Sequence, residues 1–379
     1  MKDVIGEATA TREALHPSRN GLWIAIFLAC IQDAIYALVF LSYMNHYLLD
    51  VLGSSGALPG YTLALFGLFK LGMHPVAGRL LDRVSPRLIY WGAVTLQVVG
   101  LLVMLTSASL PGFLGATCLV ALGSGAAWPF LYHLVARTQP AELAHFTPWR
   151  AAFGVSLVLV ITPLLFQGMP VVGGRSIVRD DDGHARIAIS ERIAAVALFG
   201  AIVLADFAAV SSIAAAYGPY TKRTLGLDLL QTILVLTPAG IAAVTGLWVA
   251  SRRSRPERRM TELTIMAVIA AGGTLALSFI SVPALAVLVA IPPAAALGAI
   301  GPIVAAVVIE YGSTRDRGLV IGTLMAIEGA GAVAGPAITA FVIGIATPGA
   351  GFAAIGVMFL CMAALTFRAR RPARRTTAA

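Results

Sequence analysis

Long apolar stretches alternate with short polar stretches along most of the chain. Several of them, such as 88–106 and 283–309, contain no charged residue at all. Each is about as long as the roughly 20 residues that a helix needs to cross a bilayer. The pattern therefore predicts an all-α polytopic membrane protein. The eleven apolar segments are 22–47, 58–80, 88–106, 111–136, 149–168, 193–217, 228–250, 261–281, 283–309, 318–345 and 350–367.

The second and third of these segments are joined by a short charged turn. It contains Gly78, Asp82, Arg83, Pro86 and Arg87. Three arginines in ten residues predict that this turn lies in the cytoplasm, because Lys and Arg in short loops resist translocation. We expect the glycine to let the helix ends approach closely and the proline to occupy the first turn of the next helix.

The turn resembles the cytoplasmic loop of the major facilitator superfamily at Gly78, Asp82, Arg83 and Arg87, with Ser85 where that family usually has a second glycine. The resemblance implies two helical bundles that rock about a central site and so give alternating access. It also implies a role for these residues in gating at the cytoplasmic side.

The two halves of the chain repeat each other at a constant offset of 173 residues. An aspartate within a span and two helix prolines recur at this offset, and chance seldom aligns such residue types. A parallel tandem repeat is what the resemblance implies. The matched pairs are Asp33 and Asp206, Tyr47 and Tyr220, Leu52-Gly53 and Leu225-Gly226, Gly67 and Gly240, Gly100 and Gly273, Gly125 and Gly298, Pro129 and Pro302, and Pro163 and Pro336.

The last span of the second half has no counterpart in the first half. The matching region of the first half is polar and contains Asp180, Asp181 and Asp182, which cannot cross lipid as a helix. A normal sixth span is therefore missing. The expected organisation is a cytoplasmic tail 1–20, an N-terminal bundle 21–168, a polar linker 169–192, a C-terminal bundle 193–367 and a basic cytoplasmic tail 368–379.

The distribution of basic residues decides between two topologies. If both halves have the same orientation, all but three of the 27 Lys and Arg residues lie in cytoplasmic segments. If all eleven segments crossed in turn, more than half would lie outside, against the positive-inside rule. We expect the first arrangement, in which 149–168 crosses incompletely or returns through a crossing buried by protein. The alternative is a chain damaged by an internal deletion or frame change.

Composition excludes a soluble domain, since 58% of residues are hydrophobic and only 12% are charged. The net charge of +9 is explained by arginines in loops, so no nucleic-acid partner is expected. The chain has no metal-binding, P-loop or nucleophile-elbow motif. We therefore expect no enzyme activity, no cofactor and no metal.

Ionisable residues inside spans are costly and are functional candidates by default. Asp33 and Asp206 are expected to line a central proton or substrate pathway, with Tyr36 orienting Asp33, or else to be satisfied structural acids. Lys70 is expected to pair with an acid, and Asp33 is the nearest along the chain; a structural ion pair and a substrate site are equally open. Glu328 lies on the same helix face as small residues, so its side chain is expected either at a helix–helix contact or in the central cavity. His74 and His133 are read as packing or surface residues.

The fourth span resembles the family motif in its small residues and proline, but Leu119 stands where many proton-coupled members have arginine. The fifth span keeps only Pro163 of the glycine-rich antiporter pattern, while residues 331–336 contain a better copy. This favours export. The residues expected in helix packing are Gly125, Pro129, Gly298, Pro302, Gly331, Gly335 and Pro336.

The sequence thus predicts a secondary transporter for a small organic solute in the cytoplasmic membrane, proton-coupled and monomeric, with both termini in the cytoplasm. An apolar lining of Trp128, Phe130 and Tyr217 favours an amphipathic or apolar solute. A membrane scaffold that has kept this fold but lost transport is the alternative.

Overall fold

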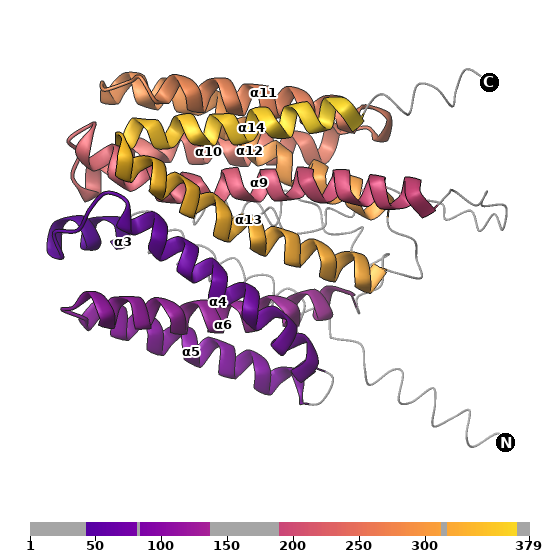
Figure 1. Cartoon of the computed structure of the whole chain (residues 1–379), viewed down its shortest axis with the longest axis horizontal. Helices are drawn as coiled ribbons and strands as arrows, with labels where there is room; N and C mark the ends of the chain where they lie inside the picture. The colour runs from indigo at the N-terminus through magenta and orange to yellow at the C-terminus, as the bar shows by residue number, and fades with distance from the viewer. Residues whose placement is uncertain (1–42, 82–83, 137–188, 312–316, 370–379) are drawn as a thin grey trace.

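The computed structural model describes residues 43–81, 84–136, 189–311 and 317–369, and this part of the chain is helical without strands (Figure 1). The all-α fold class is confirmed, and nine of the eleven predicted spans are long helices. Of the other two segments, 22–47 is described only from residue 43, and 149–168 lies outside the described ranges. The elements are α3 (Met44–His46), η2 (Tyr47–Val51), α4 (Leu58–Leu81), α5 (Pro86–Thr106), α6 (Leu110–Ala136), α9 (Ile189–Arg223), α10 (Leu229–Arg253), η4 (Pro256–Arg258), α11 (Arg259–Leu277), α12 (Pro283–Tyr311), α13 (Arg317–Ile345) and α14 (Pro348–Ala369).

Helix starts follow local capping chemistry. The Ser85 hydroxyl accepts a hydrogen bond from the backbone N–H of Leu88 at 3.4 Å, and Pro86 occupies the first turn of α5, as predicted. α10 begins with a capping box, in which Asp228 accepts from the Gln231 backbone at 2.8 Å and the Gln231 side chain accepts from the Asp228 backbone. These caps satisfy amide groups that have no partner within the helix.

The structure confirms the internal repeat and its offset. α5 and α11 begin 173 residues apart, and so do α6 and α12. Contacts between helices recur at the same offset: a Cβ on Gly125 would meet the Lys70 carbonyl oxygen, and one on Gly298 would meet the Ala243 carbonyl oxygen. Below, the N-terminal half means the described residues up to 136, and the C-terminal half means α9 to α14.

Hydrogen bonds and backbone conformation recur as well. Tyr47 donates its hydroxyl hydrogen to the Ser107 carbonyl, and Tyr220 donates to the Ile280 carbonyl at 2.7 Å. Gly53 and Gly226, which end the first helix of each half, have φ angles of 59° and 68°, a region where glycine carries no steric cost.

Both halves point the same way. α4 begins beside Asp50 and ends near Arg79, and α10 begins beyond Arg223 and ends at Arg253 (Figure 1). We call the two ends of the molecule the Asp50 end and the arginine end. α6 finishes and α9 starts at the arginine end, so eleven successive crossings are excluded. α9 begins at Ile189, within the range that the sequence assigned to the polar linker.

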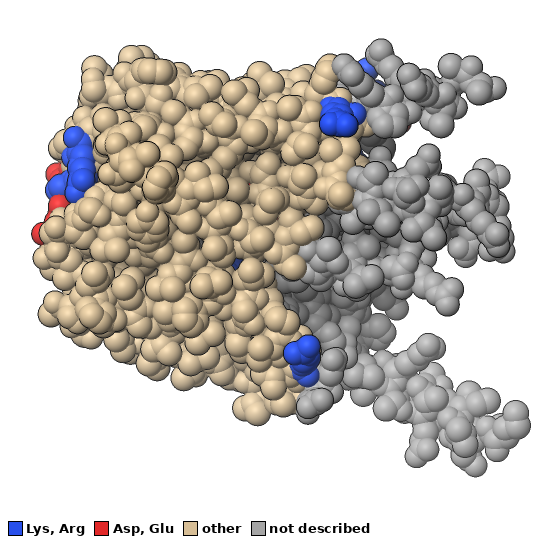
Figure 2. Space-filling model, in the orientation of Figure 1, with Lys and Arg blue, Asp and Glu red and all other residues tan. Residues whose placement is uncertain are grey.

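Charged side chains gather at the two ends, whereas the flank between them is almost free of charge (Figure 2). Eight of the described helices are long and apolar enough to cross a membrane. Large apolar side chains such as Trp91 and Leu102 are exposed on this flank, which suits contact with lipid. The chain is a multi-pass membrane protein.

The halves meet along α4, α9 and α13, and at the Asp50 end polar contacts join them. Lys222 lies 3.1 Å from Asp50, and Arg223 donates to the Ser54 carbonyl at 3.0 Å. Partial burial raises the pKa of the Asp50 carboxyl, but hydrogen bonds from His46 and Lys222 outweigh that effect and hold the pKa below its ordinary value. We call these contacts the Asp50 cluster.

Replacing Gly298 with alanine should destabilise the C-terminal half by about 1–3 kcal/mol, because the new Cβ would strike the Ala243 carbonyl oxygen. The midpoint of thermal unfolding in detergent measures this. The control is Gly272→Ala on α11, where no described atom lies within 4 Å and alanine is the better helix former by about 1 kcal/mol. Equal midpoints for the two variants would contradict the packing argument.

Replacing Asp50 with asparagine should loosen the Asp50 end, since Lys222 and His46 lose a charged partner. The expected shift toward separated halves is up to about five-fold in population, given that exposed ion pairs contribute about 1 kcal/mol or less. Pulsed electron resonance between spin labels near Gly53 and Gly226 measures the separation. The lowered pKa keeps Asp50 ionised at neutral pH, so its contact with Lys222 should be present in the wild type under these conditions. An unchanged distance distribution in Asp50→Asn would show that the carboxylate does not hold this end.

Candidate functional site

Four ionisable side chains lie along the seam between the halves. Lys70 and His74 are on α4, Asp206 is on α9, and Glu328 is on α13. We call them the seam charges. They come from three helices and from both halves, so any relative movement of the halves changes their surroundings.

Close helix contacts bring the seam charges together. α4 and α13 run antiparallel, and a Cβ on Gly329 would lie 2.5 Å from the Leu71 side chain, which places Lys70 level with Glu328. On the other side of α13, a Cβ on Gly331 would lie 2.8 Å from the Leu204 carbonyl oxygen of α9. Small residues thus let α13 approach both neighbours, as expected for helix association in lipid.

Glu328 is the centre of the cluster electrostatically, because it interacts with both Lys70 and Asp206. Lys70 also interacts with His74, which follows it by one helical turn. The cluster therefore combines two carboxyl groups, one ammonium group and one imidazole. All of these can gain or lose a proton.

Asp206 stands out because its side chain is fully buried, and neither carboxyl oxygen has a hydrogen-bond partner among the described residues. Both ring nitrogens of His74 are likewise buried without such a partner. A carboxylate without partners is costly in a medium of low dielectric constant, so such a group pairs with a cation or takes up a proton. The arrangement suits reversible protonation rather than a permanent ion pair.

The structure describes only part of the predicted site. Asp33, Tyr36, Asp82 and Arg83 lie outside the described residues, so the proposed pairing of Lys70 with Asp33 stays a prediction. The side chains of Arg87, Trp128, Pro129, Phe130 and His133 are outside it as well. No described atom lies within 4 Å of a Cβ placed on Gly78, so the described residues give no support for a close approach there.

The following contacts surround the glycines for which a role in helix packing is predicted. Gly125 and Gly298 contact the neighbouring helix of their own half, and Gly331 and Gly335 contact α9. Pro302 and Pro336 lie inside α12 and α13. Apart from the small residues around Glu328 on α13, no sequence feature indicated that Glu328 would lie level with Lys70.

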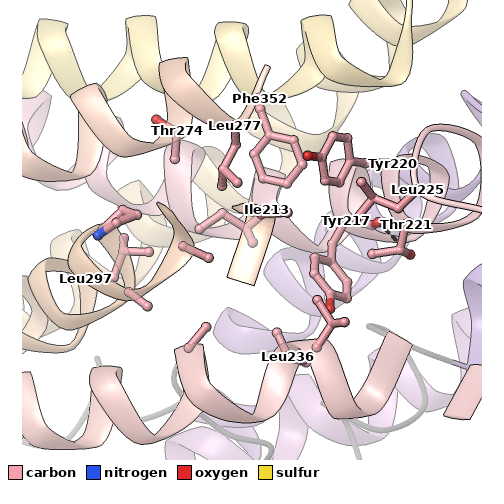
Figure 3. A pocket seen from close by; sticks show the side chains of 16 residues that line it. Ile213, Tyr217, Tyr220, Thr221, Leu225, Leu236, Thr274, Leu277, Leu297 and Phe352 are labelled. Atoms are coloured by element: carbon pink, nitrogen blue, oxygen red, sulfur yellow. Dashed lines mark hydrogen bonds between the residues drawn. The ribbon is translucent and has the colours of Figure 1, made fainter. Parts of the chain in front are cut away.

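Tyr217 lines an apolar cavity inside the C-terminal half, near the Asp50 end (Figure 3). The cavity has a volume of about 90 Å³ and lies between α9, α10, α11, α12 and α14. Tyr217 donates its hydroxyl hydrogen to the Thr232 carbonyl at 2.9 Å, so the phenol is held against α10. Within the described ranges, no group of three or more His, Cys, Asp or Glu residues is placed to hold a metal ion.

Comparison with known proteins identifies the fold. No family model and no curated protein sequence matches the chain. Among solved structures, the human organic anion transporter MFSD10 (TETRAN) is similar, with a TM-score of 0.62, 16% identity, and coverage of 92% of this chain and 100% of that one. A mutant of the nucleoside transporter NupG has a TM-score of 0.59 at 13% identity and covers 93% of this chain and 98% of its own. A second NupG structure has the same TM-score at 9% identity, with coverage of 92% and 98%. With the parallel repeat and the helix arrangement described above, this similarity shows that the chain has the fold of the major facilitator superfamily transporters.

Proposed function

We propose that this protein is a secondary active transporter, which exports a small organic solute across the cytoplasmic membrane in exchange for protons. The observation that carries the proposal is the buried Asp206, whose carboxyl group has no hydrogen-bond partner among the described residues and interacts electrostatically with Glu328 at the seam. Evolution retains ionisable groups at such depth chiefly for ion and proton pathways.

Protonation at the seam can be coupled to movement of the halves. In the present conformation Glu328 interacts with a cation across the seam and with an acid on its own half. Adding or removing one proton changes this balance, and so changes the relative free energy of arrangements in which α4 and α13 meet differently. Coupling of this kind needs two states with different electrostatic contacts. Contacts at the seam change when the halves move, whereas contacts inside one bundle do not.

The contacts of the Asp50 cluster support the proposed mechanism. They close the gap between the halves at that end, so the solute would enter this conformation from the arginine end. The positive-inside rule places the arginine end in the cytoplasm. The direction of export is supported by the resemblance of residues 331–336 to the antiporter pattern.

The proposed solute is a small organic molecule of amphipathic or apolar character. MFSD10 is named an organic anion transporter and NupG a nucleoside transporter, so proteins with this fold move organic solutes of that size. The seam charges are few, which disfavours a polyanion or a sugar.

The Asp206→Asn and Glu328→Gln substitutions should each lower solute flux driven by a pH gradient at least ten-fold, because the amides cannot carry a proton. The measurement uses proteoliposomes and a panel of radiolabelled organic solutes. Exchange predicts accumulation when the vesicle interior is acidic, whereas cotransport predicts it when the exterior is acidic.

The matched control is Asp228→Asn, the same chemical change at an exposed position, where asparagine caps α10 as well as aspartate does. It should retain wild-type flux. If both seam variants fold and transport as well as this control does, proton coupling through these groups is refuted. If the wild-type protein moves no solute under any gradient, the scaffold alternative is favoured.

Removing one member of the Lys70 and Glu328 pair should destabilise the protein more than removing both. Lys70→Met removes a cation that interacts electrostatically with Glu328 across the seam, so the added Glu328→Gln should recover part of the loss, with a coupling of about 0.5–3 kcal/mol. A double-mutant cycle on thermal unfolding gives the coupling energy. Strictly additive effects would mean that the two side chains do not interact.

A further inference from the structure

The apolar cavity in the C-terminal half can be compared with the matching region of the N-terminal half. Three of the helices that line it, α10, α11 and α12, repeat α4, α5 and α6 of the N-terminal half at the offset of 173 residues, and contacts among them recur in register, whereas α14 has no described counterpart. For these three helices, the N-terminal half shows which side chains stand at the matching positions.

Two phenylalanines of the N-terminal half are replaced by alanine around the cavity. Phe113 corresponds to Ala286, and Phe66 corresponds to Ala239. Phe113 is fully buried and packs with Met44 and Met104, which are also fully buried. Two aromatic rings that stand at these positions in the N-terminal half are therefore absent from the surroundings of the cavity.

In the N-terminal half, the ring of Phe113 has a stacking partner. Phe113 stacks on Tyr47 with ring centroids 5.0 Å apart and an interplanar angle of 16°. Tyr220, the counterpart of Tyr47, is held by its hydrogen bond to Ile280 and meets Phe352 at its edge, at 75°. Alanine at position 286 leaves Tyr220 without the stacking partner that Phe113 provides to Tyr47.

The hydroxyl groups that line the cavity already donate hydrogen bonds within the protein. Tyr217, Tyr220, Thr221 and Thr274 all donate to backbone carbonyl oxygens. The rest of the lining is aliphatic or aromatic, so a guest would find few polar groups with which to interact (Figure 3). A charged or strongly polar guest would lose its hydration without compensation.

We propose that this cavity is a binding site for a single apolar aromatic ring, which takes the place that Phe113 fills in the N-terminal half and stacks on Tyr220. An engineered apolar cavity of about 150 Å³ stays dry and binds benzene, so the smaller volume here limits a guest to a single ring. Offset or stacked contact with Tyr220 adds to the dispersion gained from the aliphatic walls. The site lies within one bundle and is separate from the seam charges, so it does not depend on the proposed transport mechanism.

The test is the binding of fluorobenzene to the full-length protein in lipid nanodiscs, followed by fluorine saturation-transfer NMR, with empty nanodiscs as the lipid background. Wild-type protein should show saturable binding above that background. Ala286→Phe and Ala239→Phe each restore the filled state of the other half, and should weaken binding at least ten-fold while leaving the unfolding midpoint unchanged or higher. Phe113→Ala should create a second site and increase the amount bound.

The two filling variants are independent, so one that fails to fold leaves the other to decide. Folding is verified by a single elution peak and a cooperative unfolding transition. Absence of saturable binding to the wild type overturns the proposal. So does wild-type affinity in either folded filling variant, because the probe would then bind elsewhere.

Discussion

Direct contact between helix backbones at glycine holds each half of this protein together. Lipid gives no hydrophobic drive for helices to associate, so the helices depend on dispersion and on close approach. Because Gly125 on α6 has no side chain, the Lys70 carbonyl of α4 can lie close to it. Gly298 on α12 allows the same approach by the Ala243 carbonyl of α10. Because the contact has the same register twice, α4 packs on α6 as α10 packs on α12.

The interiors of the halves and the seam between them differ in how polar groups are satisfied. Within the halves, hydroxyl groups such as those of Thr62, Thr117 and Thr274 donate to the carbonyl oxygen one turn earlier, which leaves no demand on other helices. At the seam, Asp206 is buried without a hydrogen-bond partner among the described residues. A rigid interior and a polar seam whose groups are not fully satisfied are what two bundles need if they are to change their relative position.

Much of the fold followed from the sequence, since it depends on features that are local or periodic. Segment lengths predicted the helices, basic residues predicted the common orientation of the halves, and the spacing of Tyr47 and Tyr220 revealed the repeat. The proximity of Lys70 and Glu328 was not predictable in this way. They lie on helices of different halves, and an apolar helix in lipid carries little periodic signal of which face meets protein, because lipid and core are equally apolar. The cavity was missed for the same reason, although the aligned halves already pair Phe113 with Ala286.

The comparison between the halves bears on why a cavity persists. An unfilled space of about 90 Å³ costs about 2 kcal/mol at roughly 24 cal/mol per Å³. A single substitution could remove most of that cost, as the N-terminal half shows, since Phe113 fits the same helix arrangement. The N-terminal half thus shows that helices of this repeat can hold a buried ring at the position of Ala286, although the contacts of α14 have no described counterpart there. The proposed guest would offset the cost of the space, because a ligand that binds only the folded state stabilises that state. The four hydroxyl groups that donate to backbone carbonyls around the cavity disfavour a polar guest.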